Sequence, residues 1–388
     1  MVRFLYLNSN SLIIAIVSAI ALFLAFFYAF LVLYMRSGWD KIPTFQLETE
    51  TFKTKVSVLI AARNEEEKIH LTIEDILAQN YPKELLEIII VDDHSTDNTS
   101  KIIASYAKDG VKLIQLNEAA PLNSYKKKAI SEAINLATGE LIVATDADCR
   151  MENKWLANVV AMYETGNWNL ISSPVVYFEE KSFFERIQTL EFLYLIGLGA
   201  AGVGNKVPTT CNGANLAYKK EVFLALDGFK GIDDLASGDD ELFLHKVAKV
   251  YPGTIGFCKS YDAIVYTHGK ENLKEFLKQR KRWASKTVKY DNNALLLVAV
   301  SIWLFNVSLA VNFVLAFFFP AFAKLLAVQF LIKFAAEAFF LERLTTFAKR
   351  SGLLSNLIVI TFIHVIYFIY IGLAGNTGKY DWKGRSVN

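Results

Sequence analysis

Cysteine is scarce in this chain of 388 residues, and neither sign of charge dominates it. Its three cysteines, Cys149, Cys211 and Cys258, are widely spaced and form neither a C-x-x-C pair nor an even disulfide set. This pattern argues against a disulfide framework or a structural zinc site and fits a reducing, cytosolic environment. The formal net charge of +2 excludes a strong field over the whole chain, so we expect no nucleic acid among its partners.

Long apolar runs, in contrast, are prominent. Hydrophobic residues make up 53% of the chain, which is too much for an ordinary soluble protein. The uncharged run 11–34 is longer than the roughly 20 residues that a membrane-spanning helix needs. A secretory signal peptide is the competing interpretation, but its apolar core would be about 7 to 15 residues long and would precede a cleavage site, which this run does not. We therefore predict an uncleaved transmembrane anchor within residues 1–38.

The last quarter of the chain returns to apolar sequence. Residues 294–319 and 353–375 carry no charge and are each long enough to cross a bilayer. The stretch 321–341 between them is charged, and its Lys333 and Glu337 are four apart and can pair on one helix face. A full span, an oblique helix and a re-entrant segment all fit this stretch. The predicted C-terminal elements are a bundle of two or three spans and a short basic tail, at 294–375 and 376–388.

Residues 52–289 have a different character, with charges at normal frequency and short apolar strands alternating with amphipathic helical stretches. This alternation predicts an α/β domain. The clearest strands are four apolar runs at 55–62, 86–91, 111–116 and 141–145. Polar residues follow several of them, at the end of the strand where open α/β sheets bind ligands.

Two further stretches are amphipathic. Residues 183–193 place apolar side chains on one helical face, and residues 272–290 combine apolar residues with many lysines and arginines. Such helices can lie at a bilayer surface. A core-facing helix with a solvated basic face fits each stretch equally well, but the neighbouring spans favour the interface.

Paired carboxylates carry the candidate chemistry. Asp146 and Asp148 follow the run LIVAT, so both emerge at one edge of the sheet. Hard cations such as Mg²⁺ or Mn²⁺ bind such oxygen ligands and can bridge a diphosphate, neutralising its charge as it leaves. A D-x-D triplet alone is common in solvated loops, so its position after a buried strand matters. We predict a metal site at Asp146 and Asp148.

Further polar groups accompany this triplet. They are Asp92 and Asp93 after the second strand, Asp239 and Asp240 after Gly238, and the basic segment QRKRW at 279–283. Clustered carboxylates are unfavourable unless they bind a cation or carry out acid–base chemistry. The alternatives are a turn or helix cap for the first pair and a solvated or lipid-facing helix for the basic segment. His268, upstream of that segment, is a candidate metal ligand or diphosphate contact, although a lone histidine is more often structural.

The ordered motifs ARNE, VDDHSTD, a lysine cluster, TDAD, CNGAN, GDDE and QRKRW resemble glycosyltransferase family 2. The similarity is to its membrane-bound branch, which contains cellulose, chitin and hyaluronan synthases and ceramide glucosyltransferase. It covers residues 56–286. The resemblance implies a GT-A fold with a mostly parallel sheet, an inverting reaction and a nucleotide-sugar donor, usually a UDP-sugar.

The resemblance also implies roles for individual residues. Donor contacts are implied for Ala61, Arg63, Glu65, Asp93, Lys126, Asp146, Gln279 and Arg282, with Asp93 at the uracil and Lys126 near the diphosphate. Asn212 and Gly213 fall in the family's acceptor-side loop. We expect the Trp283 indole to offer the acceptor an apolar face.

Two points of the comparison stay open. Tyr125 stands where many relatives have a glycine, and the run of lysines at 126–128 leaves open which amine reaches the phosphates. The family's Asp-x-x-Leu pattern selects Asp239 as the general base, whereas alignment of the letters G-D-D selects Asp240. We expect an in-line displacement in which Asp239, or failing that Asp240, takes the proton of an acceptor hydroxyl and the anomeric configuration inverts.

For the acceptor we favour a membrane lipid or lipid-linked molecule over processive polysaccharide synthesis. A processive synthase needs a channel walled by enough helices to keep sugar hydroxyls from lipid, and the expected spans are few. A catalytically silent nucleotide-sugar-binding module, or a partner subunit of an export complex, is the alternative from another class. The complete set of carboxylates argues against a module without catalytic activity.

We also expect a multi-pass protein of the cell membrane with its catalytic domain in the cytoplasm, because nucleotide sugars are cytosolic. The N-terminus would then lie outside. Basic residues occur both in the loop after Leu341 and in the tail, and the positive-inside rule cannot place both inside if 353–375 crosses fully. The tail segment Trp382-Lys383-Gly384-Arg385 resembles the cytosolic tail of ceramide glucosyltransferase. We therefore place the tail inside and expect 321–341 to cross incompletely.

Overall fold

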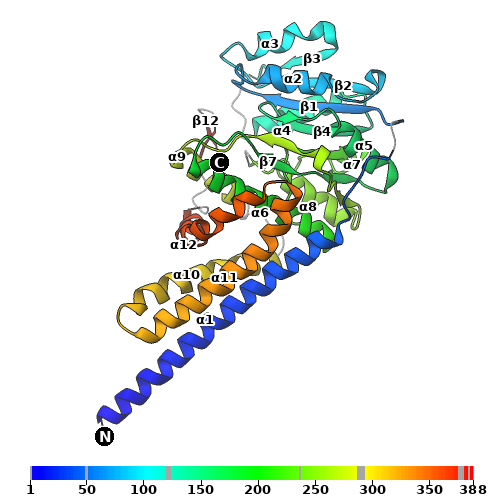
Figure 1. The fold of residues 1–388 in the computed structure, drawn as a ribbon. Helices are drawn as coiled ribbons and strands as arrows, with labels where there is room; N and C mark the ends of the chain where they lie inside the picture. The colour runs from blue at the N-terminus through cyan, green and yellow to red at the C-terminus, as the bar shows by residue number, and fades with distance from the viewer. Residues whose placement is uncertain are drawn as a thin grey trace. The chain divides into compact units, whose positions relative to one another are not determined.

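The computed structural model describes residues 2–48, 51–118, 124–235, 237–285, 293–374, 380–382 and 385–387 (Figure 1). The chain divides into two compact units. The helical unit contains Met1–Arg36 and Lys274–Gly378, and the sheet unit contains Ser37–Leu273 and Lys379–Asn388. Lys383 and Gly384 of the predicted tail motif lie outside the described residues.

The sheet unit is built on a seven-stranded sheet with the order β3-β2-β1-β4-β8-β6-β9. Its strands are β1 (Val56–Ala62), β2 (Leu86–Asp92), β3 (Val111–Gln115), β4 (Leu141–Asp146), β6 (Leu170–Ser172), β8 (Leu216–Lys219) and β9 (Ile255–Phe257). Only β8 runs antiparallel to its neighbours, so the predicted mostly parallel α/β architecture is confirmed. The four predicted strands correspond to β1, β2, β3 and β4 within two residues at each end.

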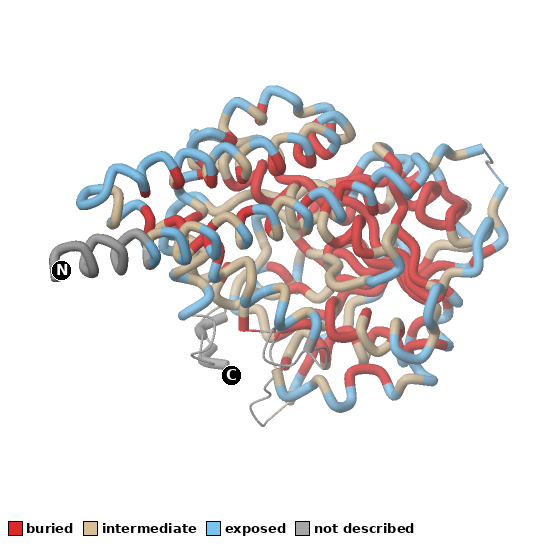
Figure 2. Tube along the Cα trace, turned by 90° about the horizontal axis from the view of Figure 1, so that it is seen from below, coloured by how far each residue is buried: buried red, intermediate tan, exposed pale blue. Residues whose placement is uncertain are grey.

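The central strands are mostly apolar, as expected of strands in a sheet that helices cover. Six of the seven residues of β1 are buried, as are six of the seven in β2. Figure 2 shows buried segments in red gathered in the interior. The helices of this unit are α2 (Ile69–Leu77), α3 (Thr99–Ser105), α4 (Tyr125–Leu136), α5 (Trp155–Thr165), α6 (Phe183–Gly204), α7 (Lys220–Ala225) and α8 (Glu241–Val250). Short 3₁₀ helices lie at η1 (Lys83–Leu85), η2 (Ala107–Asp109) and η3 (Tyr261–Ala263).

Two smaller sheets complete the strand pairing. One has the order β5-β10-β7 and contains β5 (Arg150–Met151), β7 (Val175–Tyr177) and β10 (Val265–Thr267). The other pairs β11 (Tyr380–Trp382) with β12 (Arg385–Val387).

Helix α6 contains the first predicted amphipathic stretch, 183–193. Ser182 caps its N-terminus by accepting a hydrogen bond from the Glu185 N–H. Phe183 is exposed, but Leu190 and the residues around it are buried within the unit. From its second turn onward α6 therefore matches the core-facing alternative better than a helix lying on a bilayer surface.

The helical unit contains most of the apolar sequence. Its elements are α1 (Val2–Lys41, which continues into the sheet unit), α9 (Leu273–Ala284), α10 (Asn293–Ala316), α11 (Pro320–Phe347), η5 (Ser351–Asn356) and α12 (Leu357–Ala374). Among the described residues, four helices are long and apolar enough to cross a membrane: Ile14–Lys41, Phe183–Gly204, Ala294–Ala316 and Ser351–Ala374. These candidate spans indicate a membrane protein.

Helix α11 falls outside that set because of its charges, two of which, Lys333 and Glu337, are buried inside the unit. The Lys333 ammonium is fully buried and pairs with the Glu337 carboxylate, as the i, i+4 spacing predicted. The Tyr28 hydroxyl of α1 donates to the same carboxylate. One turn from Lys333, Gln329 donates to the Ala21 carbonyl at 3.1 Å. A polar seam, formed by Tyr28, Gln329, Lys333 and Glu337, thus joins α1 to α11.

This seam predicts a large cost for removing one charge. Lys333→Met leaves the Glu337 carboxylate buried without its cation, which destabilises a protein by about 3–5 kcal/mol. We expect a strongly lowered Tm for the single variant and recovery in Lys333→Met/Glu337→Leu, measured by thermal unfolding in lipid nanodiscs. Lys324→Met, which removes an exposed lysine of the same helix, is the matched control. An unchanged Tm for Lys333→Met would show that the pair does not stabilise the unit.

Candidate active site

The ends of three neighbouring strands form the candidate site. In the parallel ladders Ala62 of β1 pairs with Asp92 of β2, and Ala61 pairs with Asp146 of β4. The loops after β1, β2 and β4 therefore leave the same edge of the sheet. This is the edge at which the sequence predicted ligand binding.

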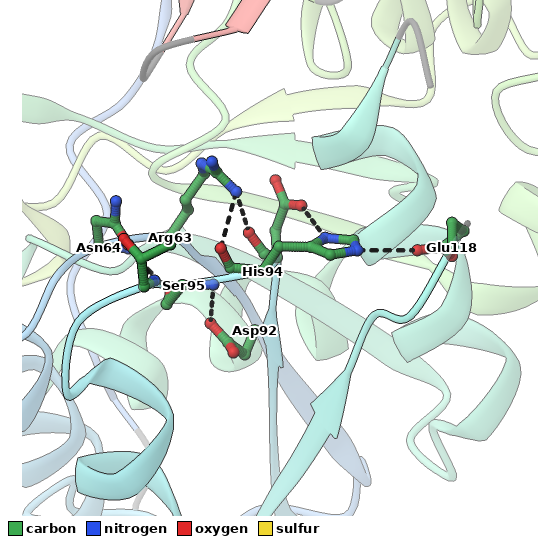
Figure 3. A network of polar contacts seen from close by, with 8 residues as sticks. Arg63, Asn64, Asp92, His94, Ser95 and Glu118 are labelled. Carbon is green, nitrogen blue, oxygen red and sulfur yellow. Dashed lines mark hydrogen bonds and ion pairs between the residues drawn. The ribbon is translucent and has the colours of Figure 1, made fainter. Parts of the chain in front are cut away.

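Arg63 ties the first two loops together. Its Nη1 donates to the backbone carbonyls of Asp93 at 2.7 Å and His94 at 3.0 Å (Figure 3). Asn64 and His94 both have a positive φ, at 50° and 55°. In this position Arg63 acts on the backbone of the loop and supports Asp93.

The adjacent aspartates of the second loop differ in role. One Asp92 carboxylate oxygen accepts the Ser95 N–H at 3.3 Å, which fits the turn alternative for that residue. The Asp93 carboxylate is 2% exposed and contacts the His94 imidazole, with 3.0 Å between Oδ1 and Nδ1. Glu65 helps to hold the two loops together, because its N–H donates to Thr99 Oγ1 at 2.8 Å.

The three consecutive lysines have separate partners. Lys126 Nζ lies 2.8 Å from Asp146 Oδ1 and 3.3 Å from Asp239 Oδ2. Lys127 is buried, and its ammonium donates to three carbonyls of the segment that leads to Asp239, those of Ile232, Leu235 and Ser237. Lys128 pairs with Glu132 along its own helix. Only Lys126 therefore faces the carboxylates at the strand ends.

The negative charges around Lys126 favour its protonated form. Burial alone lowers the pKa of Lys126, but the carboxylates of Asp146 and Asp239 outweigh it and raise the pKa above its ordinary value. Lys126 is thus a fixed cation between two acidic side chains that come from β4 and from the loop before α8.

Asp240 has a structural position at the start of α8. Its Oδ1 accepts the Glu241 N–H at 2.7 Å and caps the helix, while its Oδ2 accepts the Gly213 N–H at 3.0 Å. A methyl group at Gly213 would lie 3.4 Å from Asp239 Oδ2, so this glycine lies directly against the aspartate pair. Asn212 closes its own loop by accepting the Ala214 N–H at 2.9 Å.

Two residues near the cluster were not recognised from the sequence. Asn215 is buried and donates to the carbonyls of Pro174 and Ala263, which fixes the strand after the Asn212 loop. Burial, followed by the charge of Asp239, raises the pKa of the Tyr218 phenol. Asn215 is the last residue of the CNGAN motif, which had given it no role, whereas Tyr218 belongs to no motif and is placed by the pairing of β8.

The predicted metal ligands are only partly assembled. Within the described residues no group of three or more histidine, cysteine or acidic side chains can hold a metal ion. Asp146 is paired with Lys126, whereas the half-buried Asp148 carboxylate makes no hydrogen bond or ion pair with the described chain. Mg²⁺ and similar cations bind through one or two carboxylates plus substrate phosphates, so this donor pair fits a site that the donor completes.

His268 directly follows β10, which runs antiparallel to β5 with Tyr266 opposite Arg150. Asp148 lies two residues before β5, and its charge acts on the His268 imidazole. Burial lowers the pKa of His268, which favours the neutral imidazole that metals bind. Its ring also stacks on Phe178, with 4.6 Å between centroids, so a structural role fits equally.

The Q-x-x-R-W residues lie on α9, in the helical unit. Gln279, Arg282 and Trp283 are each partly buried there. The buried arginine of this helix is Arg280, whose guanidinium lies 4.2 Å from the Trp283 ring centroid. The sequence motif indicated Arg282 as the functional arginine and did not predict that Arg280 packs against Trp283.

A protein-family model supports the resemblance inferred from these motifs. Residues 57–226 match the model described as "Glycosyl transferase family 2". Residues 57–226 therefore form a domain of the glycosyl transferase family 2 type. The prediction of a family 2 glycosyltransferase is therefore confirmed, and with it the GT-A-like α/β domain.

Proteins similar to this chain carry names that imply different acceptors. A beta-monoglucosyldiacylglycerol synthase from Nostoc sp. strain PCC 7120 is 34% identical over 120 residues, which are 31% of this chain and 26% of that protein. A poly-beta-1,6-N-acetyl-D-glucosamine synthase from Staphylococcus epidermidis is 25% identical over 239 residues, covering 59% and 53%. This chain thus spans only about half, or less, of the length of either protein.

One solved structure shares the fold. The mannosyltransferase PcManGT from Pyrobaculum calidifontis, in complex with GDP-Man and Mn²⁺, superposes with a TM-score of 0.58 at 22% identity. The match covers 89% of this chain and 99% of that one. At this identity the likeness supports the fold.

Proposed function

We propose that the chain is a nucleotide-sugar-dependent, inverting glycosyltransferase that transfers a hexosyl group to a hydroxyl of a membrane lipid or lipid-linked acceptor. The observation that carries this proposal is the Lys126 ammonium between Asp146 and Asp239 at the carboxyl edge of the sheet. The Lys126 ammonium suits the negative charge of a diphosphate, and the Asp239 carboxylate suits the proton of a reacting hydroxyl.

The donor side of the proposal runs along the ends of β1, β2 and β4. Ala61, Arg63 and Glu65 would line the nucleotide, with Asp93 at the base. Lys126 would meet the diphosphate, where a fixed cation stabilises developing negative charge. Asp146 and Asp148, with His268 as a candidate third ligand, would hold Mg²⁺ or Mn²⁺, which supplies further charge neutralisation at the leaving diphosphate. The Mn²⁺ in the PcManGT complex is consistent with such a site.

For the general base we propose Asp239. Both carboxylate oxygens of Asp240 accept backbone N–H groups, which fixes that side chain to the start of α8 and to Gly213. Asp239 uses Oδ2 toward Lys126, and its other oxygen makes no hydrogen bond within the described residues. A base needs such an accessible oxygen to take the proton of the acceptor hydroxyl.

In this proposal the remaining motif residues contact either the acceptor or the donor diphosphate. Asn212 and Gly213 would border it on the sheet unit. Gln279 and Arg282 would contact the donor diphosphate, because the planar guanidinium suits phosphate oxygens. Trp283 would offer the acceptor an apolar face. A cytoplasmic position of the catalytic domain also belongs to the proposal.

A lipid acceptor is supported by the diacylglycerol glucosyltransferase relative and by the small number of candidate spans. Processive polymer synthesis is the second candidate, supported by the poly-N-acetylglucosamine synthase relative. Helix α11, with 28 residues and a length of about 42 Å, is long enough to add a further span, with Lys333 and Glu337 buried inside the unit.

The test is product analysis with purified protein in lipid nanodiscs containing diacylglycerol and a panel of UDP- and GDP-sugars. We expect one or a few sugars on an extractable lipid, identified by mass spectrometry. A long, lipid-free polysaccharide from donor alone would decide for the processive alternative. Absence of any donor turnover across the panel would favour a silent binding module.

A further inference from the structure

Lys127 is the neighbour of the active-site cation Lys126 but makes quite different contacts. It is the third residue of α4, and its side chain is 2% exposed. Its ammonium donates to the backbone carbonyls of Ile232, Leu235 and Ser237, at 2.7 Å for Leu235 and 2.9 Å for Ser237. An ammonium has three hydrogens to donate, and here three carbonyls of one segment accept from it.

The segment that Lys127 holds has no regular structure of its own. It belongs to the loop between α7 and α8, and the described residues of that loop form no helix or strand. A loop of this kind places a functional group accurately only when contacts from the rest of the domain fix its backbone. The Lys127 ammonium supplies such contacts, because charge-assisted hydrogen bonds are short and directional.

Asp239 follows this segment directly, two residues after Ser237. Gly238 lies between them with a φ of 82°, a left-handed value that glycine adopts readily. Since glycine restricts the backbone less than any other residue, the place of Asp239 depends on the anchors at either side of it. On one side Asp240 is fixed by its hydrogen bonds at the start of α8, and on the other the Ser237 carbonyl is fixed by Lys127.

We propose that Lys127 is a positioning residue that places Asp239 for proton abstraction by holding the backbone of the preceding segment. The inference rests on the proposed function, in which Asp239 is the general base, and it gives the second lysine of the run a role away from the phosphates. The first turn of α4 holds the base twice, through Lys126 at its carboxylate, 3.3 Å away, and through Lys127 at its backbone segment. Because Lys126 also lies 2.8 Å from Asp146, this turn relates the position of the base to the donor site.

The experiment measures the turnover number of the full chain in lipid nanodiscs, with the donor that supports transfer in the product analysis. The dissociation constant of the matching nucleotide, UDP or GDP, is measured by calorimetry with Mn²⁺ present. Lys127→Met should lower the turnover number by roughly 10², the effect of displacing a reacting group by about 1 Å. Nucleotide affinity should stay within about threefold of wild type, because the base acts on the acceptor.

Two further substitutions on α4 calibrate this result. Lys127→Gln keeps two donor hydrogens on a side chain that is one bond shorter, so it should lower the turnover number less than Lys127→Met does. Lys128→Met removes only the ion pair with Glu132 along the helix and should stay close to wild type. If Lys127→Met does not fold, as judged by circular dichroism, Lys127→Gln replaces it in every measurement.

A double-mutant cycle separates positioning of the base from general stabilisation. In an Asp239→Asn background, Lys127→Met should lower the turnover number by less than about threefold, since the group that it positions is already absent. Equal losses in both backgrounds, a joint loss of turnover and nucleotide affinity, or wild-type turnover in folded Lys127 variants would each overturn the inference and leave the glycosyltransferase standing. Wild-type turnover of Asp239→Asn alone would refute the proposed base, and a wild type that transfers no sugar would refute the proposed function itself, in both cases together with the inference.

Discussion

Asp239→Asn should lower the turnover number of sugar transfer by roughly 10² to 10⁴, the usual contribution of a general base. The affinity for the nucleotide should change little, since the base acts on the acceptor hydroxyl. The structural reason is that one oxygen of Asp239 contacts Lys126 while the other makes no hydrogen bond within the described residues.

Asp240→Asn is the matched control because asparagine is also a good N-cap. Because asparagine has one acceptor oxygen where Asp240 uses two, the variant should keep the cap of α8 but lose the bond from the Gly213 N–H, and it should still retain more activity than Asp239→Asn. Turnover and nucleotide binding are measured together on both variants, with circular dichroism to monitor folding. The reverse order of activities would assign the base to Asp240, and two variants within about threefold of wild type would leave the displacement without its base.

Local sequence patterns were sufficient to predict the strands that form the site. The β-branched runs of β1, β2 and β4 end where polar residues begin, and parallel pairing brings those ends together. The pairing of Lys333 with Glu337 was likewise predictable, since it depends only on spacing along one helix. Features of this kind depend only on residues that are close together in the sequence.

Contacts between distant segments were not predictable in this way. The sequence could not separate Lys126 from Lys127, because only the position of the loop before α8 shows that Lys127 is engaged by backbone carbonyls. It likewise could not show that Asp240 holds Gly213, that Tyr28 shares the Glu337 carboxylate, or that α6 is largely buried. Each of these depends on tertiary packing, which overrides local pattern.

For the metal ligands too, the local motif was predictable from the sequence, whereas the contacts between distant segments were not. The D-x-D triplet was visible as a motif, but its relation to His268 comes from the antiparallel register of β5 and β10, over one hundred residues apart in sequence. The contact between Lys126 and Asp146 was also not predictable from the sequence. Its ammonium occupies Asp146 Oδ1, so a cation and the lysine would share the charge of one carboxylate while Asp148 remains available.

Asp148→Asn should therefore abolish measurable sugar transfer while the protein stays folded and inserted. The change removes a charged oxygen from a site that otherwise has only the shared Asp146 carboxylate and a neutral histidine, and hard cations bind weakly to amides by comparison. Excess EDTA should have the same effect on wild type, and added Mn²⁺ should restore activity. Asp233→Asn, at an exposed carboxylate of the α7–α8 loop, should stay close to wild type in both assays.

Full activity of wild type in EDTA would remove the metal from the mechanism, and Lys126 would then be left as the cation that meets the diphosphate. An inactive Asp148→Asn variant in a metal-independent enzyme would instead indicate a direct contact of Asp148 with the donor sugar.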